Sequence, residues 1–174
     1  MSVTGPLEMK YARALQEQYE LLRKTLAHYL LLQVGTFVTA VGYDAIAPAM
    51  NILADKKAEL KIKEIRERDG ATGDAAMVAL SDSLAESMGE TFQSDYGIKV
   101  GDGLRTVGLH RCGCIESVTA HAEDYGLTRQ QARSIFCGTC VSSYKKAAEG
   151  LGLGFSAKLV GEHGCSMSFS TKQA

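Results

Sequence analysis

The chain has 174 residues, which is long enough for one domain with a substantial hydrophobic core. Its formal net charge is -1, from 19 basic and 20 acidic residues, so no excess charge attracts nucleic acid or an anionic membrane. These properties predict a single domain over residues 1–174 whose partners are small molecules or further copies of itself.

The N-terminal sequence lacks the basic and apolar regions of a signal peptide, which favours a cytoplasmic, reducing location. The most apolar stretch is HYLLLQVGTFVTAVGY, residues 28 to 43. It is shorter than the roughly 18 apolar residues of a membrane span, and it contains Gln33, Thr36 and Thr39. We therefore expect it to form a buried helix of the core or of a subunit interface.

Residues 1–95 are predicted to be mainly helical. An amphipathic helix is expected from about Pro6 to Ala27, because apolar residues recur at steps of three and four, namely Leu7, Tyr11, Leu15, Tyr19 and Leu22. Such a stripe packs on its own domain, which is the commoner outcome, or forms a seam between two chains. A homodimer, the predicted assembly, would use the second alternative.

Further helices are expected before residue 95. Pro48 interrupts the apolar stretch, because proline has no backbone donor. The charged segment after it suits a helical surface, although Leu60 and Ile62 could also alternate in a short strand, and both alternatives stay open. A helix from about Asp74 to Ser94 is indicated by the spacing of Met77, Leu80, Leu84, Met88 and Phe92.

Residues 96–174 are predicted to form a strand, two helices and a hairpin. The strand is expected where Val107 and Leu109 alternate with Gly108 and His110. IESVTAHAEDYG suits a helix closed by Gly126. The next helix should begin with a capping box of Thr128 and Gln131 and continue to about Glu149. The hairpin is indicated by two alternating runs with one buried face: Phe155, Ala157, Leu159, and then Cys165, Met167, Phe169.

The predicted fold class is therefore α/β of the α+β kind, with a helical N-terminal half followed by an antiparallel sheet packed with helices. All five cysteines lie after residue 111, in the segments RCGC, FCGTC and EHGC. In a strand, Cys112 and Cys114 would face the same side. In a helix, Cys137 and Cys140 would point together. If that helix lies across the sheet, these four thiols and Cys165 converge in one pocket.

Soft thiolates at these spacings favour metal or redox chemistry over a disulfide framework. All five cysteines are predicted metal ligands, and their number favours an iron-sulfur cluster or a closed zinc site over a catalytic zinc site. Two alternatives stay open. Each cysteine could pack as a small apolar group, or Cys137 and Cys140 could form a thiol-disulfide switch.

Histidines and glutamates near the cysteines are further candidates. His110 and His163 are each two residues from a cysteine and are expected on the thiol face, whereas His121 is expected within a helix. Glu116 and Glu162 could act as general bases or remain solvated charges. The predicted catalytic residues belong to two versions of the site. In the favoured version, Glu116, His110 or His163 moves protons beside a bound metal. In the other, Cys137 attacks as a nucleophile that a histidine activates.

From Cys114 onward the sequence resembles the L-2-amino-thiazoline-4-carboxylic acid hydrolase family and the 4-vinyl reductase-like domains. The similar segments, which span about sixty residues, are EDYGL, FC, GLGLGF and LVGEHGCSMSF. The resemblance implies helices packed on an antiparallel sheet, frequent dimerisation, and family cysteines at Cys114, Cys137 and Cys165. Cys112 and Cys140 depart from the family pattern, which indicates an enlarged ligand set.

Three functions follow as hypotheses. The first is a hydrolase-like enzyme acting on a small sulfur- or nitrogen-containing molecule at a cysteine-ligated iron-sulfur cluster or zinc ion. The second is a small-molecule binding or sensor module of the 4-vinyl reductase type, which a metal stabilises. The third is a redox-responsive iron-sulfur protein.

Overall fold

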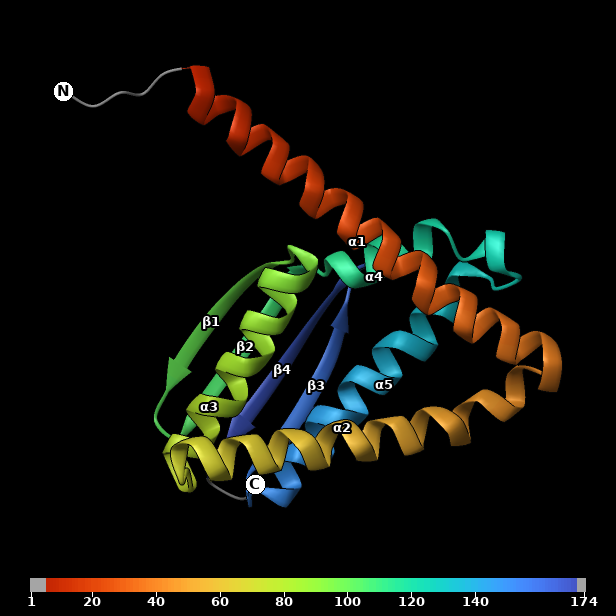
Figure 1. The fold of residues 1–174 in the computed structure, drawn as a ribbon. Coiled ribbons are helices and arrows are strands. Elements are labelled where there is room, and N and C mark those ends of the chain that lie inside the picture. The colour runs from red at the N-terminus through yellow and green to blue at the C-terminus, as the bar shows by residue number, and fades with distance from the viewer. Residues whose placement is uncertain (1–5, 172–174) are drawn as a thin grey trace.

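The computed structural model describes the backbone of residues 6–171 and the side chains of residues 14–67 and 70–171. Its helical N-terminal half leads into a four-stranded antiparallel sheet packed with helices, which confirms the predicted fold class (Figure 1). The helices are α1 (Pro6–Val41), α2 (Ile46–Asp69), α3 (Gly73–Glu86), α4 (Gly113–Ala120) and α5 (Arg129–Gly150). The strands are β1 (Asp95–Gly101), β2 (Leu104–Arg111), β3 (Gly154–Val160) and β4 (Gly164–Ser170), in the sheet order β1-β2-β4-β3.

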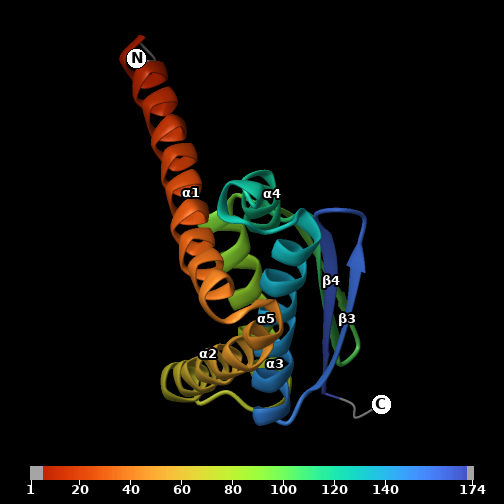
Figure 2. The same cartoon turned by 90° about the vertical axis from the view of Figure 1, so that its right-hand side faces the viewer.

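The helices α3 and α5 lie on one face of the sheet, and α2 crosses on their outer side (Figure 2). The inner face of the central strands carries Val107, Met167 and Phe169, all fully buried. Phe169 contacts the rings of Phe155 and Tyr144, at centroid distances of 5.5 and 6.3 Å. The opposite face is polar: Thr106 and Ser168 pair across it through their hydroxyl groups, 2.8 Å apart. The core therefore lies between the sheet and the helices.

The first two predicted helices are one helix, because α1 continues to Val41 through the apolar stretch. It ends at Gly42, which has a φ of 89°, and not at Pro48. Pro48 lies in the first turn of α2, where its missing amide leaves no intrahelical hydrogen bond unmade. The charged segment that could have been a strand is also part of α2.

The apolar stripe at the start of α1 is solvent-exposed where its side chains are described, at Leu15, Tyr19 and Leu22. Its earlier members, Leu7 and Tyr11, lie outside the described side chains. In Figures 1 and 2 the N-terminal half of α1 projects from the rest of the molecule. The apolar stretch is only half buried, because Leu31 and Val34 face the core while other apolar residues face solvent.

Three further predictions are wrong in detail. The helix expected to reach Ser94 ends at Glu86 and is followed by a π-helical turn over Ser87–Thr91. The segment before β2, for which no strand was predicted, forms β1, so the sheet has one strand more than predicted. The exposed side chains of β1 gave no pattern of a buried face. The helix expected over residues 115–126 is α4 with a separate 3-10 turn at Glu123–Tyr125.

The capping box and the C-terminal hairpin are confirmed. Thr128 accepts a hydrogen bond from the Gln131 amide, and the Gln131 side chain accepts one from the Thr128 amide, at 3.1 and 2.8 Å. β3 and β4 pair around the expected turn, and Cys165, Met167 and Phe169 are buried. The predicted buried face of β3 is wrong in part, because β3 is an edge strand and its Ala157 and Leu159 are exposed. In the described residues, no single helix is long and apolar enough to cross a membrane; only the bent combination of α1 and α2 meets that length and composition.

Gly113 sets how closely α4 approaches the π-helical turn. A Cβ atom at this position would lie 1.8 Å from the Phe92 carbonyl oxygen. We predict that Gly113→Ala lowers the free energy of unfolding by about 2–4 kcal/mol, because the backbone must move to relieve the clash. Gly138→Ala is the matched control: a Cβ there meets nothing within 4 Å. It should raise stability by about 0.5–1 kcal/mol through helix propensity. Urea denaturation measures both, and equal stability of the two variants would contradict this packing.

Candidate functional site: a thiol-lined cavity

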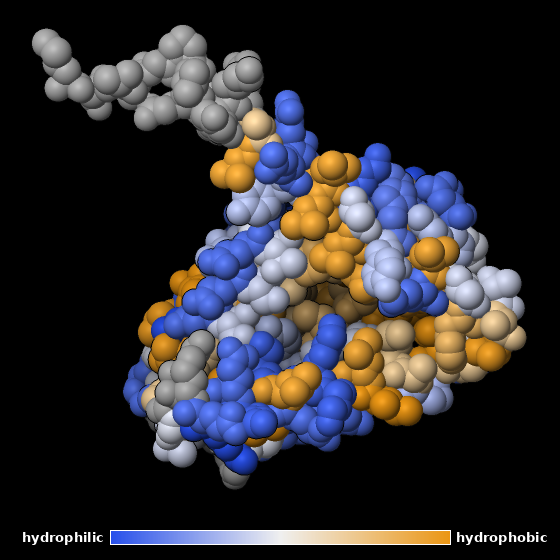
Figure 3. Space-filling model, viewed as in Figure 1, coloured by the Kyte–Doolittle hydropathy of each residue, from blue (hydrophilic) through white to orange (hydrophobic). Residues whose placement is uncertain are grey.

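All five cysteines line one cavity of about 570 Å³. It lies between α1 and α2 on one side and α4, α5 and the central strands on the other. Figure 3 shows a hollow between α1 and α2 that is lined largely by apolar side chains. The predicted convergence of the thiols is therefore confirmed, although the cysteines reach the cavity by different routes.

Cys112 and Cys114 do not lie in a strand, as predicted from their spacing. β2 ends at Arg111, Cys112 is the N-cap residue of α4, and Cys114 lies in the first turn of that helix. The Cys112 amide donates to the carbonyl of His163 at 2.9 Å, which ties this turn to the β3–β4 hairpin. The Gly113 amide donates to the Ser94 hydroxyl at 3.0 Å. Both thiols reach the cavity because the chain turns there, not because side chains alternate.

Cys137 and Cys140 lie three residues apart on α5, as predicted, and both line the cavity. Cys165 is the second residue of β4 and pairs with Leu109 of β2 and Leu159 of β3. Its buried side chain lies on the inner face of the sheet. The cavity therefore brings together thiols from a helix start, the middle of a helix and a strand.

Burial is the largest influence on the acidity of these thiols. Burial, together with the neighbouring Cys112 and Cys137, raises the pKa of Cys114 and of Cys165 to about 12. Burial also raises the pKa of Cys140, and all four other cysteines add to that rise. These mutual effects show that the sulfurs are within electrostatic reach of one another. Because a buried thiolate is costly in an apolar cavity, Cys114, Cys140 and Cys165 are protonated at neutral pH.

The pKa of Cys137 is raised by burial and by Cys112, while the nearby Arg133 guanidinium opposes part of the increase. Arg133 donates to the Gly161 carbonyl at 2.6 Å, and its Nε is buried without a hydrogen-bond partner among the described residues. A nucleophilic cysteine needs a lowered pKa. The surroundings of Cys137 give no support to that role.

The structure places only one predicted proton carrier in the cavity. His163 lines it, and its Nε2 lies 3.4 Å from the Thr119 hydroxyl. Glu116 is not among the lining residues: it pairs with Arg111 at 2.7 Å and with Arg23 at 3.9 Å.

The remaining candidates also lie away from the thiols. His110 was expected on the thiol face, but it alternates with buried Leu109 and is exposed on the other side of β2. Glu162 is exposed in the turn after β3. His121 caps the C-terminal end of α4, where its ring lies 4.3 Å from that of His28.

The sequence predictions missed the charged groups of the cavity. Lys57, Lys61 and Glu64 line it from α2, and Tyr144 lines it from α5. One signal could have found Lys61: it falls at helical spacing within the buried stripe of Ala54, Ala58 and Ile65. A lysine in an apolar stripe is unusual. It was missed because the segment around it is rich in charged residues, and such segments are usually solvent-exposed.

The thiols are suitable metal ligands by their chemistry, but the described side chains are not arranged to hold a single metal ion. Soft, buried thiols are suitable ligands for zinc or iron. Within the part of the chain that the structure describes, however, no three histidine, cysteine, aspartate or glutamate side chains are placed so that they could hold a metal ion. The thiols share a cavity without gathering around one point.

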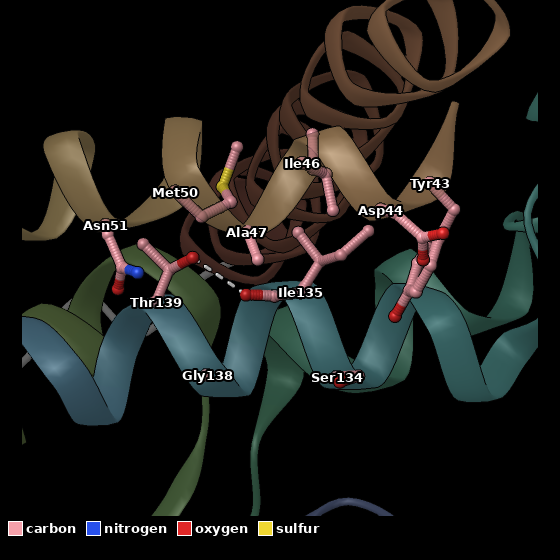
Figure 4. Close-up of a pocket in the computed structure, with 10 residues that line it drawn as sticks. All are labelled: Tyr43, Asp44, Ile46, Ala47, Met50, Asn51, Ser134, Ile135, Gly138 and Thr139. Atoms are coloured by element: carbon pink, nitrogen blue, oxygen red, sulfur yellow. Dashed lines mark hydrogen bonds between the residues drawn. The ribbon is translucent and has the colours of Figure 1, made fainter. Parts of the chain in front are cut away.

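A second hollow, of about 300 Å³, lies between the start of α2 and the middle of α5 (Figure 4). Ile46, Met50 and Thr139 line both hollows. The Thr139 hydroxyl donates to the Ile135 carbonyl at 2.8 Å, so it could only accept a hydrogen bond from a ligand. The lining residues of this hollow include no cysteine or histidine. Its chemistry is therefore poorer than that of the thiol-lined cavity.

The raised thiol pKa values predict slow alkylation of the folded, metal-free protein. At pH 8, a thiol with a pKa of about 12 is ionised to roughly one part in ten thousand, against about a quarter for an ordinary cysteine. We expect Cys114 and Cys165 to react with iodoacetamide at least about a thousandfold more slowly than in the guanidinium-unfolded chain, and to accelerate as the pH approaches 12. Mass spectrometry of each site measures this. Rapid labelling of either cysteine in folded protein would contradict it.

Comparisons with known proteins add no relative on which to base a function. No protein-family model matches the chain, and no curated protein is significantly similar to it. The resemblance to the thiazoline hydrolases and the 4-vinyl reductase-like domains therefore stays a prediction. The function has to be argued from the cavity itself.

Proposed function

We propose that the thiol-lined cavity holds an iron-sulfur cluster and binds a small molecule beside it. The protein would then be a small-molecule enzyme, hydrolase-like on a sulfur- or nitrogen-containing substrate, as the family resemblance implies. One observation carries this proposal: five thiols from three separate parts of the chain line one largely apolar cavity of about 570 Å³. Cavities of this size are typical of small-molecule sites.

The number of thiols favours a cluster over a catalytic zinc site. A catalytic zinc site uses three protein ligands, whereas five cysteines line this cavity. In a four-iron cluster each iron atom binds one cysteine. Four cysteines suffice for such a cluster, and the chain has five.

Metal binding would also change the charge state of these buried thiols. A bound metal stabilises the thiolate, which the apolar cavity alone disfavours. If only three cysteines bound the cluster, its fourth iron would keep an open coordination position and would supply a Lewis acid for substrate or water. We assign proton transfer to His163, because it lines the cavity while Glu116 is held in ion pairs outside it. Five unpaired cysteines also favour a reducing, cytoplasmic location.

A second candidate function is a small-molecule binding or sensor module stabilised by the same metal. The observation that favours it is the lining of the cavity, which includes Val34, Phe37, Met88, Phe136 and Met167. Such a lining binds apolar molecules without any chemical step. Turnover of a bound compound separates the two functions.

Anaerobic purification tests the cluster. We expect iron and acid-labile sulfide in stoichiometric amounts and a broad visible absorption band. Cys114→Ala and Cys165→Ala should each lose metal and thermal stability together, because each removes a ligand. His121→Ala is the control and should retain its metal, since His121 lies outside the cavity.

Other outcomes would overturn the proposal. Colourless protein with one equivalent of zinc would replace the cluster with a closed zinc site. Metal-free protein that keeps its fold and has one rapidly alkylated thiol would favour nucleophilic catalysis.

We also propose that two copies of the chain associate through α1. The support is the exposed row of Leu15, Tyr19 and Leu22, which the rest of the chain leaves uncovered. An isolated helix segment is only marginally stable in water, so this part of α1 gains from a partner. The row also leads along α1 toward Phe37, which lines the cavity and is 39% exposed.

Light scattering after size-exclusion chromatography tests this association. The wild-type chain should have the mass of a dimer, and Leu22→Glu should shift it to the monomer because the charge would be buried in the seam. Gln16→Glu adds the same charge on another side of the helix and should stay dimeric. A monomeric wild-type protein would exclude the proposal.

A further inference from the structure

Lys61 lies at a position of α2 that otherwise carries apolar residues. Ala54, Ala58 and Ile65 of the same helix face are buried, and Lys61 lies between Ala58 and Ile65 at helical spacing. Its side chain is half-buried and lines the thiol cavity. Burial lowers the pKa of Lys61 from its ordinary value, because the ammonium loses water. The cavity wall therefore contains a cation that is incompletely solvated.

The contacts that hold this ammonium are neutral. Its Nζ donates to the Ser83 hydroxyl of α3 and lies 5.3 Å from the centroid of the Tyr144 ring. The Tyr144 hydroxyl in turn donates to the Ser83 carbonyl at 3.4 Å. Three elements thus fix the position of the charge: α2, α3 and α5. A hydroxyl and an aromatic ring stabilise a cation less than a carboxylate does.

The charge balance of the cavity leaves a net positive wall. The thiols and His163 are left aside in this count. Among the other described lining residues, Lys57 and Lys61 are positively charged and Glu64 is negatively charged at neutral pH, so their net charge is one positive charge. Glu64 and Glu86 act on Lys61 from nearby and raise its pKa, and Lys57 acts in the opposite direction. The rest of the lining is mostly apolar.

We infer that Lys61 anchors the carboxylate of a ligand whose body is apolar and occupies the cavity. This inference rests on the proposed small-molecule site and adds the class of molecule, an apolar monocarboxylate. The carboxylate would bind the ammonium that Ser83 and Tyr144 hold in place, while the apolar body contacts side chains such as Val34, Met88 and Phe136. A charge-assisted hydrogen bond in a site that excludes water is worth more than one at the surface.

The competing role for Lys61 is to balance the charge of metal-bound thiolates. Cys140 lies close enough to raise the pKa of Lys61, so a cluster would also experience its field. The two roles differ in what the loss of the ammonium changes. An anchor affects the affinity for a carboxylate, whereas a counter-charge affects the cluster.

Calorimetric titration of the purified full chain with octanoate and its neutral analogue octanamide separates these roles. We expect the wild-type protein to prefer octanoate. Lys61→Met should weaken octanoate binding by about tenfold or more, the usual effect of losing a hydrogen bond to a charged group, and change octanamide binding less than about twofold. Lys61→Arg should keep the preference. Lys57→Met, which removes a cation from the same wall, should keep most of it.

The iron content of the same preparations separates failure of this inference from failure of the proposed function. Normal iron in Lys61→Met with lost octanoate preference supports the anchor. Loss of iron with unchanged octanoate affinity assigns Lys61 to the cluster and overturns it. If Lys61→Met weakens octanoate and octanamide binding equally, or if the wild-type protein binds neither compound, the inference is also overturned. Wild-type protein without iron that still prefers octanoate would reject the cluster and leave the anchor standing.

Discussion

The packing of α5 across the inner face of the sheet determines the rest of the structure. Tyr144 contacts Phe169 at a ring distance of 6.3 Å, and this contact fixes the rotation of the helix about its axis. Cys137 and Cys140 precede Tyr144 by seven and four residues, so they lie on the same helix face. The interaction that closes the hydrophobic core therefore also directs two thiols toward the sheet. Cys165, buried on β4, lies on the wall that they face.

The turn from β2 into α4 adds Cys112 and Cys114 to the thiol-lined cavity. It can be tight because Gly113 has no side chain where the Phe92 carbonyl approaches, and because Cys112 is held to the hairpin by its hydrogen bond to His163. A π-helical turn precedes Phe92 and places Ser87 and Met88 on the cavity wall. Such irregular turns occur often at functional sites, where they change the direction of a side chain. Two local departures from regular structure thus shape one end of the cavity.

The N-terminal helices form the opposite wall and give the cavity its charge. α1 and α2 meet at Gly42, and the hollow between them leaves apolar side chains exposed beside the opening. Lys61 lies in the same cavity as the thiols, held between Ser83 and Tyr144. A cavity with soft ligands, an apolar wall and a fixed ammonium can distinguish molecules by both shape and charge. That combination is the physical basis for the proposed small-molecule site.

The sequence by itself determined the fold class, α5 with its capping box, the C-terminal hairpin and the shared face of Cys137 and Cys140. These features depend on residues close together in the chain, through helical spacing, alternation and local hydrogen bonds. Only the tertiary structure decided that α1 is one long helix, that β1 exists, and that Lys61 lines the cavity while His110 and Glu116 do not. The reason is that these outcomes depend on which distant segments pack together. A side chain's spacing gives its direction on its own element, but the neighbouring elements determine whether that direction leads to solvent, to the core or into a cavity.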